Sequence, residues 1–191
     1  MFTDDEYRTR LRRLRELARA NRLDGMLLSG TAEVRYLSGF SGSSGMALLL
    51  PRSGYFLTDF RYREQSRLEV AGLRIVICED GFGEALKSIL ARRDAGKEWA
   101  GKRIGFDPHS LSCSELAELR RSLRGTAVLV PMKTDLQVMR ARKTRSEMEV
   151  IEKGLRVAEA AFREALKRVD KRTTEWELAL EVDFAARRRG A

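Results

Sequence analysis

The chain has 191 residues with a formal net charge of +9, and 43% of the residues are hydrophobic while 34% are charged. This balance is ordinary for a folded globular protein and excludes wholesale disorder. No apolar run approaches the roughly 20 residues needed to cross a bilayer, and the N-terminus lacks the basic-then-apolar layout of a secretory signal, so we expect no membrane partner.

The first 78 residues are predicted to alternate helices with strands. Thr3 and Glu6 have the spacing of a capping box, and an apolar helical face follows at Tyr7, Leu11, Leu14 and Ala18. We predict strands at 26–28, 46–50, 55–58 and 73–78, one helical turn at 33–37 and a helix at 59–70. Pro51 to Gly54 indicates a hairpin between the second and third strands.

The alternation continues to residue 131. We predict a helix at 82–93, a strand at 103–106, a helix running from a capping box at Ser112 and Glu115 to about residue 123, and a strand at 127–130. Strands that alternate with helices indicate an α/β domain, and the hairpin makes its sheet mixed rather than purely parallel. We assign this domain to residues 1–131.

Beyond residue 131 the pattern becomes helical. We assign 132–145 to a linker and place a capping box at Ser146 and Glu149. An apolar stripe then recurs at Met148, Ile151, Leu155, Ala158, Phe162, Ala165 and Val169. Thr174 with Glu177 caps a second helix. Two amphipathic helices cannot bury both their faces alone, so 146–191 are predicted to begin a second domain.

Two blocks of residues resemble one protein family. Tyr36-Leu37-Ser38-Gly39-Phe40-Ser41-Gly42-Ser43, followed by Leu57-Thr58-Asp59-Phe60-Arg61-Tyr62-Arg63-Glu64-Gln65, resembles the YLTGF…G…LLTDxRYxxQA signature of the creatinase-type N-terminal domain. The second block resembles the first helices of the pita-bread catalytic domain and consists of Met139-Arg140-Ala141-Arg142-Lys143-Thr144 with Glu147, Glu149 and Ile151, then Thr174-Glu175 and Arg189-Gly190-Ala191. The chain is therefore identified as similar to the Xaa-Pro aminopeptidase, prolidase and creatinase family.

The resemblance implies a fold and an activity. The N-terminal domain would be ribonuclease H-like, with a mixed sheet flanked by helices, and would shape the substrate cleft and a homodimer. The pita-bread domain would bind two divalent metals, manganese, cobalt or zinc, through two Asp, one His and two Glu, and a metal-bridging hydroxide would cleave the bond before proline. Its partners would be proline-containing peptides.

None of those five ligands can be carried over to this sequence. We therefore expect the chain to be the N-terminal part of a cytoplasmic metallopeptidase, truncated before its metal ligands. It would have no catalytic or metal-binding residue of its own and no activity alone. The single histidine, His109, follows Asp107 and Pro108 and is predicted to lie in a turn. Cys78 and Cys113 show no CxxC spacing, which is typical of a reducing compartment.

Three residues are candidates for the substrate cleft. Phe40 lies in the Gly/Ser loop 38–45, which lacks phosphate-loop spacing and otherwise serves as a connection. Arg61 and Tyr62 follow a strand end, where polar residues are often functional. The resemblance implies that one subunit reaches the other's active site, and the guanidinium fork of Arg61 suits a substrate carboxylate. The structural alternative is that Asp59 caps a helix and Arg61 pairs with a nearby acid.

Two other classes of function remain open. One is a non-catalytic pita-bread homologue that binds peptides or proteins and has lost the metal ligands. The other is a nucleic-acid binder, suggested by the net charge. Most of the excess charge lies at Arg8, Arg10, Arg12, Arg13 and Arg15, at Arg120, Arg121 and Arg124, and at Arg187, Arg188 and Arg189. These arginines alternate with leucines and acids, which favours solvated helix faces, so we expect no nucleic-acid partner.

Overall fold

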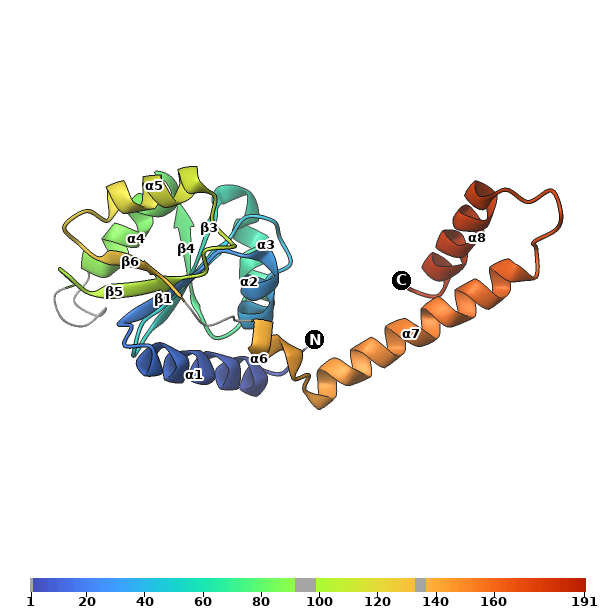
Figure 1. The fold of residues 1–191 in the computed structure, drawn as a ribbon, viewed down its shortest axis with the longest axis horizontal. Helices are drawn as coiled ribbons and strands as arrows, with labels where there is room; N and C mark the ends of the chain where they lie inside the picture. Colours follow the sequence, from blue (N-terminus) through green and yellow to red (C-terminus); the bar gives the residue numbers. More distant parts are fainter. Residues whose placement is uncertain (1, 92–98, 133–136) are drawn as a thin grey trace. The chain divides into compact units, whose positions relative to one another are not determined.

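The computed structural model describes residues 2–91, 99–132 and 137–191 (Figure 1). These residues form two compact units, Met1–Ala141 and Arg142–Ala191. The boundary between the units falls within the segment 132–145 that the sequence assigns to a linker.

The first unit is built on one six-stranded sheet with the order β4-β3-β2-β1-β5-β6. Its strands are β1 (Gly25–Leu28), β2 (Met46–Leu49), β3 (Gly54–Asp59), β4 (Arg74–Cys78), β5 (Arg103–Phe106) and β6 (Val128–Pro131). The β1–β2 and β2–β3 pairs are antiparallel, whereas the β3–β4, β1–β5 and β5–β6 pairs are parallel. The predicted mixed sheet and the hairpin around residues 51–54 are confirmed.

Helices cover both faces of this sheet (Figure 1). They are α1 (Asp4–Ala20), α2 (Thr31–Ser38), the 3-10 turn η1 (Phe60–Tyr62), α3 (Arg63–Glu69), α4 (Gly81–Ala91), α5 (Cys113–Ser122) and α6 (Gln137–Ala141). Successive strand residues point to opposite faces. Accordingly, Leu27 and Leu48 pack with the helices α4 and α5, while Met26 and Leu49 pack with α1 and α2.

Helix α1 shows how the sequence produces this packing. Thr3 and Glu6 form the predicted capping box, with the Glu6 amide donating to Thr3 Oγ1 at 3.4 Å. The predicted apolar face is buried. Arg10, which the sequence places on a solvated arginine face, is 2% exposed instead. Its guanidinium donates to the Tyr36 carbonyl at 2.7 Å and lies 4.3 Å from the Tyr36 ring, so the assignment of Arg10 to that face is wrong.

The structure also corrects several predicted element boundaries. The helix predicted at 59–70 is divided into η1 and α3, because Tyr62 has a backbone conformation outside the α-helical region. The third capping box is formed by Thr144 and Glu147 rather than by Ser146 and Glu149. The helix α6 was not predicted. The end of the helix predicted at 82–93 lies outside the described residues.

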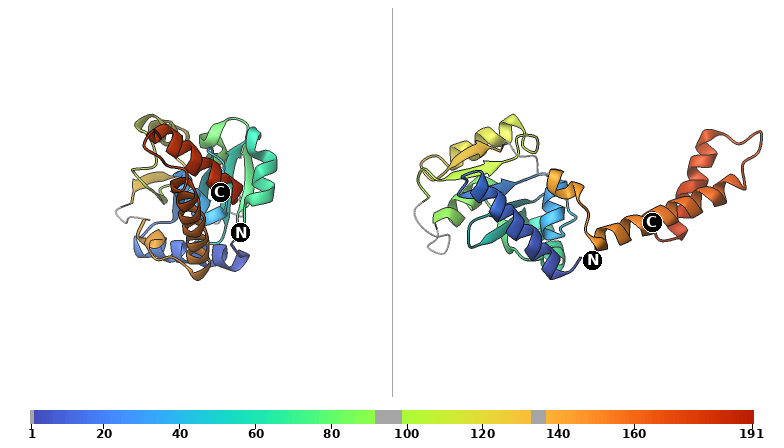
Figure 2. Two further views of the ribbon diagram at one scale, coloured as in Figure 1. Left: turned by 90° about the vertical axis from the view of Figure 1, so that its right-hand side faces the viewer. Right: turned by 60° about the horizontal axis from the view of Figure 1, so that its bottom comes forward.

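The second unit is a hairpin of two helices, α7 (Arg145–Leu166) and α8 (Glu175–Arg188), visible in Figure 2. Three alanines form the contact between these helices and are at most 1% exposed: Ala161, Ala165 and Ala185. The Glu164 carboxylate pairs with three arginines, Arg168, Arg188 and Arg189. The predicted capping box at Thr174 and Glu177 is confirmed.

The apolar stripe predicted on α7 is largely exposed. Met148, Ile151, Leu155 and Phe162 are exposed by 44%, 49%, 66% and 50%. On α8, Trp176, Leu180 and Phe184 are exposed as well. The small alanines thus join the two helices, and the large apolar side chains lie away from that contact.

Candidate functional site

The candidate site lies where β3 ends and η1 begins. The strand is buried as far as Thr58, whose hydroxyl donates to the Ser44 carbonyl at 2.6 Å. Asp59 is the first residue of this segment with partial exposure. Its carboxylate accepts from the Arg61 amide at 3.0 Å and thereby caps η1. The chain therefore turns at Asp59, and the residues that follow lie beyond the carboxyl end of β3.

Arg61 binds the Asp59 carboxylate through two hydrogen bonds. Arg61 Nε donates to Oδ1 and Arg61 Nη2 donates to Oδ2, each at 2.9 Å. These bonds hold the pKa of Asp59 well below its ordinary value and raise the pKa of Arg61. The Arg61 side chain is nevertheless 63% exposed. Both parts of the structural alternative, capping by Asp59 and pairing of Arg61 with an acid, are therefore present.

This pairing leaves one edge of the guanidinium open. Asp59 occupies the Nε–Nη2 edge of Arg61, and among the described residues no group binds the Nη1 nitrogen. A guanidinium carries five N–H donors in one plane. The Nη1–Nη2 edge of Arg61 can therefore still donate two hydrogen bonds to a second carboxylate. Arg61 thus combines a fixed orientation with free donors at the surface.

Tyr62 connects Arg61 to the core. The Arg61 guanidinium lies 5.6 Å from the Tyr62 ring, and the Tyr62 ring meets the Phe40 ring edge-on at a centroid distance of 5.4 Å. Phe40 also packs on Phe56 at 4.6 Å and is 1% exposed. The three sequence-predicted residues Phe40, Arg61 and Tyr62 are therefore brought together. Phe40 supports Tyr62 from the core, whereas Arg61 and Tyr62 reach the surface.

The Gly/Ser loop is bound to this site at both ends. The Ser41 amide and hydroxyl donate to the Glu69 carboxylate at 2.7 and 3.0 Å, and Gln65 donates to both Ser41 Oγ and Glu69. Burial raises the pKa of Glu69, but these hydrogen bonds outweigh it and leave that pKa lowered. Further along, Ser43 Oγ lies 2.8 Å from the Tyr62 hydroxyl. The loop is thus a fixed wall of the site.

Two glycines are required for this loop. Gly39 has a φ of +83°, a conformation that side chains other than glycine rarely adopt. At Gly42 a Cβ atom would lie 2.4 Å from Phe40 Cζ and 2.7 Å from Tyr62 Cε1. The absence of a side chain at Gly42 therefore allows the loop backbone to approach the two rings.

The polar contacts of the loop were not predicted from the sequence. Gln65 and Glu69 are four residues apart on α3, a spacing that places both side chains on one helical face. This spacing was the only sequence signal that pointed to the pair. It does not identify their partner Ser41, which lies 28 residues from Glu69 in the sequence. A pairing over that distance requires knowledge of the sheet topology.

The described residues do not fit a metal centre. Within residues 2–91, 99–132 and 137–191, no group of three or more His, Cys, Asp or Glu side chains is arranged to bind a metal ion. His109 is exposed, and its amide donates to Asp107 Oδ1 at 2.9 Å, which confirms the predicted turn. In the same part of the chain, no helix has the length and apolar character required for a membrane span.

Comparisons with known proteins place this fold. Residues 10–142 match the family model described as the Creatinase/Prolidase N-terminal domain. Uncharacterized peptidase YqhT of Bacillus subtilis (strain 168) is 32% identical over 182 residues, which are 95% of this chain and 50% of that protein. The chain belongs to the creatinase/prolidase family, and its first unit is the N-terminal domain of that family.

Solved structures agree with this assignment. An Xaa-Pro dipeptidase from Bacillus anthracis has a TM-score of 0.85 and 26% identity, covering 97% of this chain and 50% of its own. The N-terminal domain of the cytoplasmic peptidase PepQ from Mycobacterium tuberculosis H37Rv has a TM-score of 0.58 and 33% identity, covering 70% of this chain and 98% of its own. The chain thus spans about half the length of YqhT and of the dipeptidase.

Proposed function

We propose that this chain is the N-terminal part of a metal-dependent peptidase that hydrolyses the Xaa-Pro bond of short peptides. The observation that carries the proposal is the similarity to the Xaa-Pro dipeptidase over 97% of this chain, which includes both the sheet domain and the helical hairpin. A similarity confined to the N-terminal domain would not have indicated which kind of domain follows it in the same protein.

In this proposal the first unit shapes the substrate cleft. Arg61 supplies two donors from its open edge to the terminal carboxylate of a short peptide, and Tyr62 forms the adjoining wall. Phe40 supports Tyr62 from the core. The protein acts as a homodimer, so that Arg61 of one subunit serves the active site of the other. If binding requires the terminal carboxylate of the peptide at Arg61, the enzyme acts only on short peptides with a free C-terminus.

The metals belong to a part of the protein outside this chain. Two divalent ions, manganese, cobalt or zinc, would generate hydroxide near neutral pH and polarise the scissile carbonyl. Since the described residues form no suitable ligand group, no step of the reaction is assigned to them. The chain described here contributes orientation of the peptide, in a protein that works in the cytoplasm.

A proline-release assay tests this proposal. The longest product of the gene is purified and incubated with an Xaa-Pro dipeptide, with the 191-residue chain as the control. Proline release by the longer protein that stops on chelation and returns with added metal supports the proposal. A longer protein that releases no proline with any of the three metals contradicts it.

A further inference from the structure

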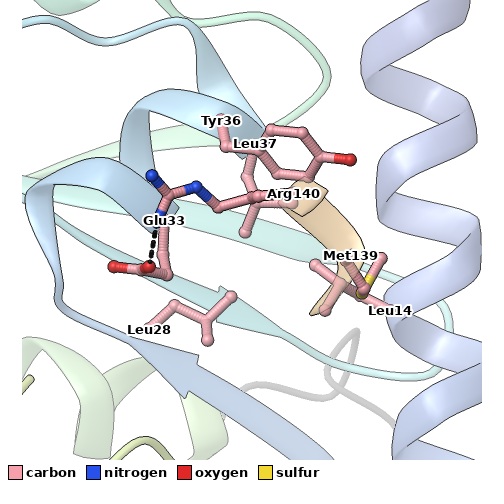
Figure 3. Close-up of a pocket in the computed structure, with 7 residues that line it drawn as sticks. All are labelled: Leu14, Leu28, Glu33, Tyr36, Leu37, Met139 and Arg140. Atoms are coloured by element: carbon pink, nitrogen blue, oxygen red, sulfur yellow. Dashed lines mark hydrogen bonds and ion pairs between the residues drawn. The ribbon is translucent and has the colours of Figure 1, made fainter. Parts of the chain in front are cut away.

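Helix α6 is a short segment that lies on the surface of the first unit, close to the point where that unit ends. It sits beside a small surface pocket lined by residues from α1, α2 and β1 together with Met139 and Arg140 of α6 itself (Figure 3). The other lining residues are Leu14, Leu28, Glu33, Tyr36 and Leu37. The helix therefore contacts three elements that are more than 100 residues distant in the sequence.

Two adjacent residues of α6 make different kinds of contact with this surface. Met139 packs against the core cluster that contains Leu14 and Leu28. Arg140 Nη1 donates to Glu33 Oε1 at 2.7 Å. The Glu33 side chain is 13% exposed and the Arg140 side chain 38% exposed. Since the pair is partly removed from water, salt screens it less than a surface pair.

Glu33 is held close to the start of α2. Glu33 lies in the first turn of α2, whose N-cap is Gly30. A Cβ atom at Gly30 would lie 2.1 Å from Glu33 Oε2. The carboxylate therefore folds back over the start of the helix, into space that only a glycine leaves open. The other carboxylate oxygen, Oε1, accepts the hydrogen bond from Arg140.

We propose that α6 is an intramolecular strap, and that the Glu33–Arg140 ion pair is the lock that keeps it bound to the first unit. While the lock is closed, α6 stays bound to the first unit, which ends at Ala141. Opening the lock releases α6 from the surface formed by α1, α2 and β1. The proposal assigns a role to Arg140, an arginine of the second sequence block that the proposed cleft does not use.

Hydrogen exchange of the 191-residue chain measures this lock directly. Glu33→Gln and Arg140→Gln each remove the ion pair and should raise the exchange rate of the amides between residues 137 and 143 by about threefold or more. The double charge reversal Glu33→Arg with Arg140→Glu should return that rate close to the wild-type value. Glu64→Gln, which breaks the exposed pair with Arg67, is the matched control and should leave the segment unchanged.

Trypsin provides an independent readout. The protease must bind the Arg140 side chain to cut the Arg140–Ala141 bond, so the lock has to open before cleavage. Glu33→Gln should speed this cut by about threefold or more relative to the cut after Arg142.

Two results would overturn the proposal. One is an unchanged exchange rate at 137–143 in both single variants. The other is a charge reversal that exchanges as fast as the single variants, since a segment bound only through Met139 would not respond to the order of the two charges. If a single variant loosens the whole first unit, the charge reversal still decides between these cases.

Discussion

Arg61 and Asp59 share two parallel hydrogen bonds of 2.9 Å, although only one residue separates them in the sequence. The backbone turn at η1 makes this possible, because Asp59 also accepts the Arg61 amide at 3.0 Å. Asp59, at the end of β3, thus holds the Arg61 guanidinium in one orientation. An exposed arginine ordinarily loses considerable side-chain entropy on binding a ligand, and a pre-oriented one loses less.

We predict that Arg61 recognises the substrate carboxylate. In the longest gene product, Arg61→Ala should lower kcat/KM for an Xaa-Pro dipeptide by about tenfold to a hundredfold, because a hydrogen bond to a charged group contributes about 1.5–3 kcal/mol. The C-terminally amidated peptide lacks the carboxylate, so the same variant should leave its kcat/KM unchanged.

Arg67→Ala is the control for this measurement. Arg67 is similarly exposed and pairs with Glu64 on the neighbouring helix α3. Arg67→Ala should leave kcat/KM unchanged for both the free and the amidated peptide. An equal loss on the free and the amidated peptide in Arg61→Ala would assign Arg61 a structural role instead.

The Asp59–Arg61 pair should make stability depend on acid pH. The folded state lowers the pKa of Asp59 from its ordinary value of 3.8. Its contribution to stability is therefore fully present above that ordinary, unfolded-state pKa and is lost as the pH falls through the lower folded-state pKa. The difference in urea midpoint between the wild type and Asp59→Asn should be constant above about pH 5 and shrink below about pH 4. A difference that grows on acidification would contradict this sign.

Two glycine-to-alanine substitutions should have opposite effects. Gly42→Ala places a methyl group against Phe40 and Tyr62 and should destabilise the first unit by about 1–3 kcal/mol. Gly154 lies within α7, and a Cβ atom there meets nothing within 4 Å. Gly154→Ala should therefore stabilise the helical hairpin by about 0.5–1 kcal/mol. Denaturation followed by circular dichroism measures both, and a neutral Gly42→Ala would mean that the loop moves freely away from the rings.

The exposed stripe on α7 should promote self-association. Contiguous apolar surfaces of this length usually mark a contact with another protein. Leu155→Glu combined with Phe162→Glu should convert a self-associated chain to a monomer in light scattering. Val150→Glu, at an exposed position outside the stripe, should not do so. A wild-type chain that is monomeric at high concentration would refute this prediction.

The parts of the fold that follow local rules could be predicted from the sequence. The helical face of α1, the hairpin at residues 51–54 and the caps at Thr3, Ser112 and Thr174 each depend on residues a few positions apart. The cap of α7 was misplaced because Thr144-x-x-Glu147 and Ser146-x-x-Glu149 both satisfy the same pattern. With five residues, α6 is too short to show a helical period.

The long-range contacts could not be predicted in this way. Ser41 meets Glu69 and Glu33 meets Arg140 only after the sheet has formed, at separations of 28 and 107 residues. Phe40, Arg61 and Tyr62 were found through the family resemblance rather than through their mutual contacts. The burial of Phe40 follows from its packing on Phe56, a neighbour that the loop sequence does not indicate.

The selectivity of the longest gene product for proline tests the central claim most directly. After chelation and reloading with manganese, cobalt or zinc, kcat/KM is measured for an Xaa-Pro dipeptide and for the matched Xaa-Ala dipeptide. We predict metal-dependent cleavage with a strong preference for the Xaa-Pro peptide. Equal cleavage of the two peptides, or a protein that binds none of the three metals and cleaves neither peptide, would contradict the assignment to an Xaa-Pro metallopeptidase.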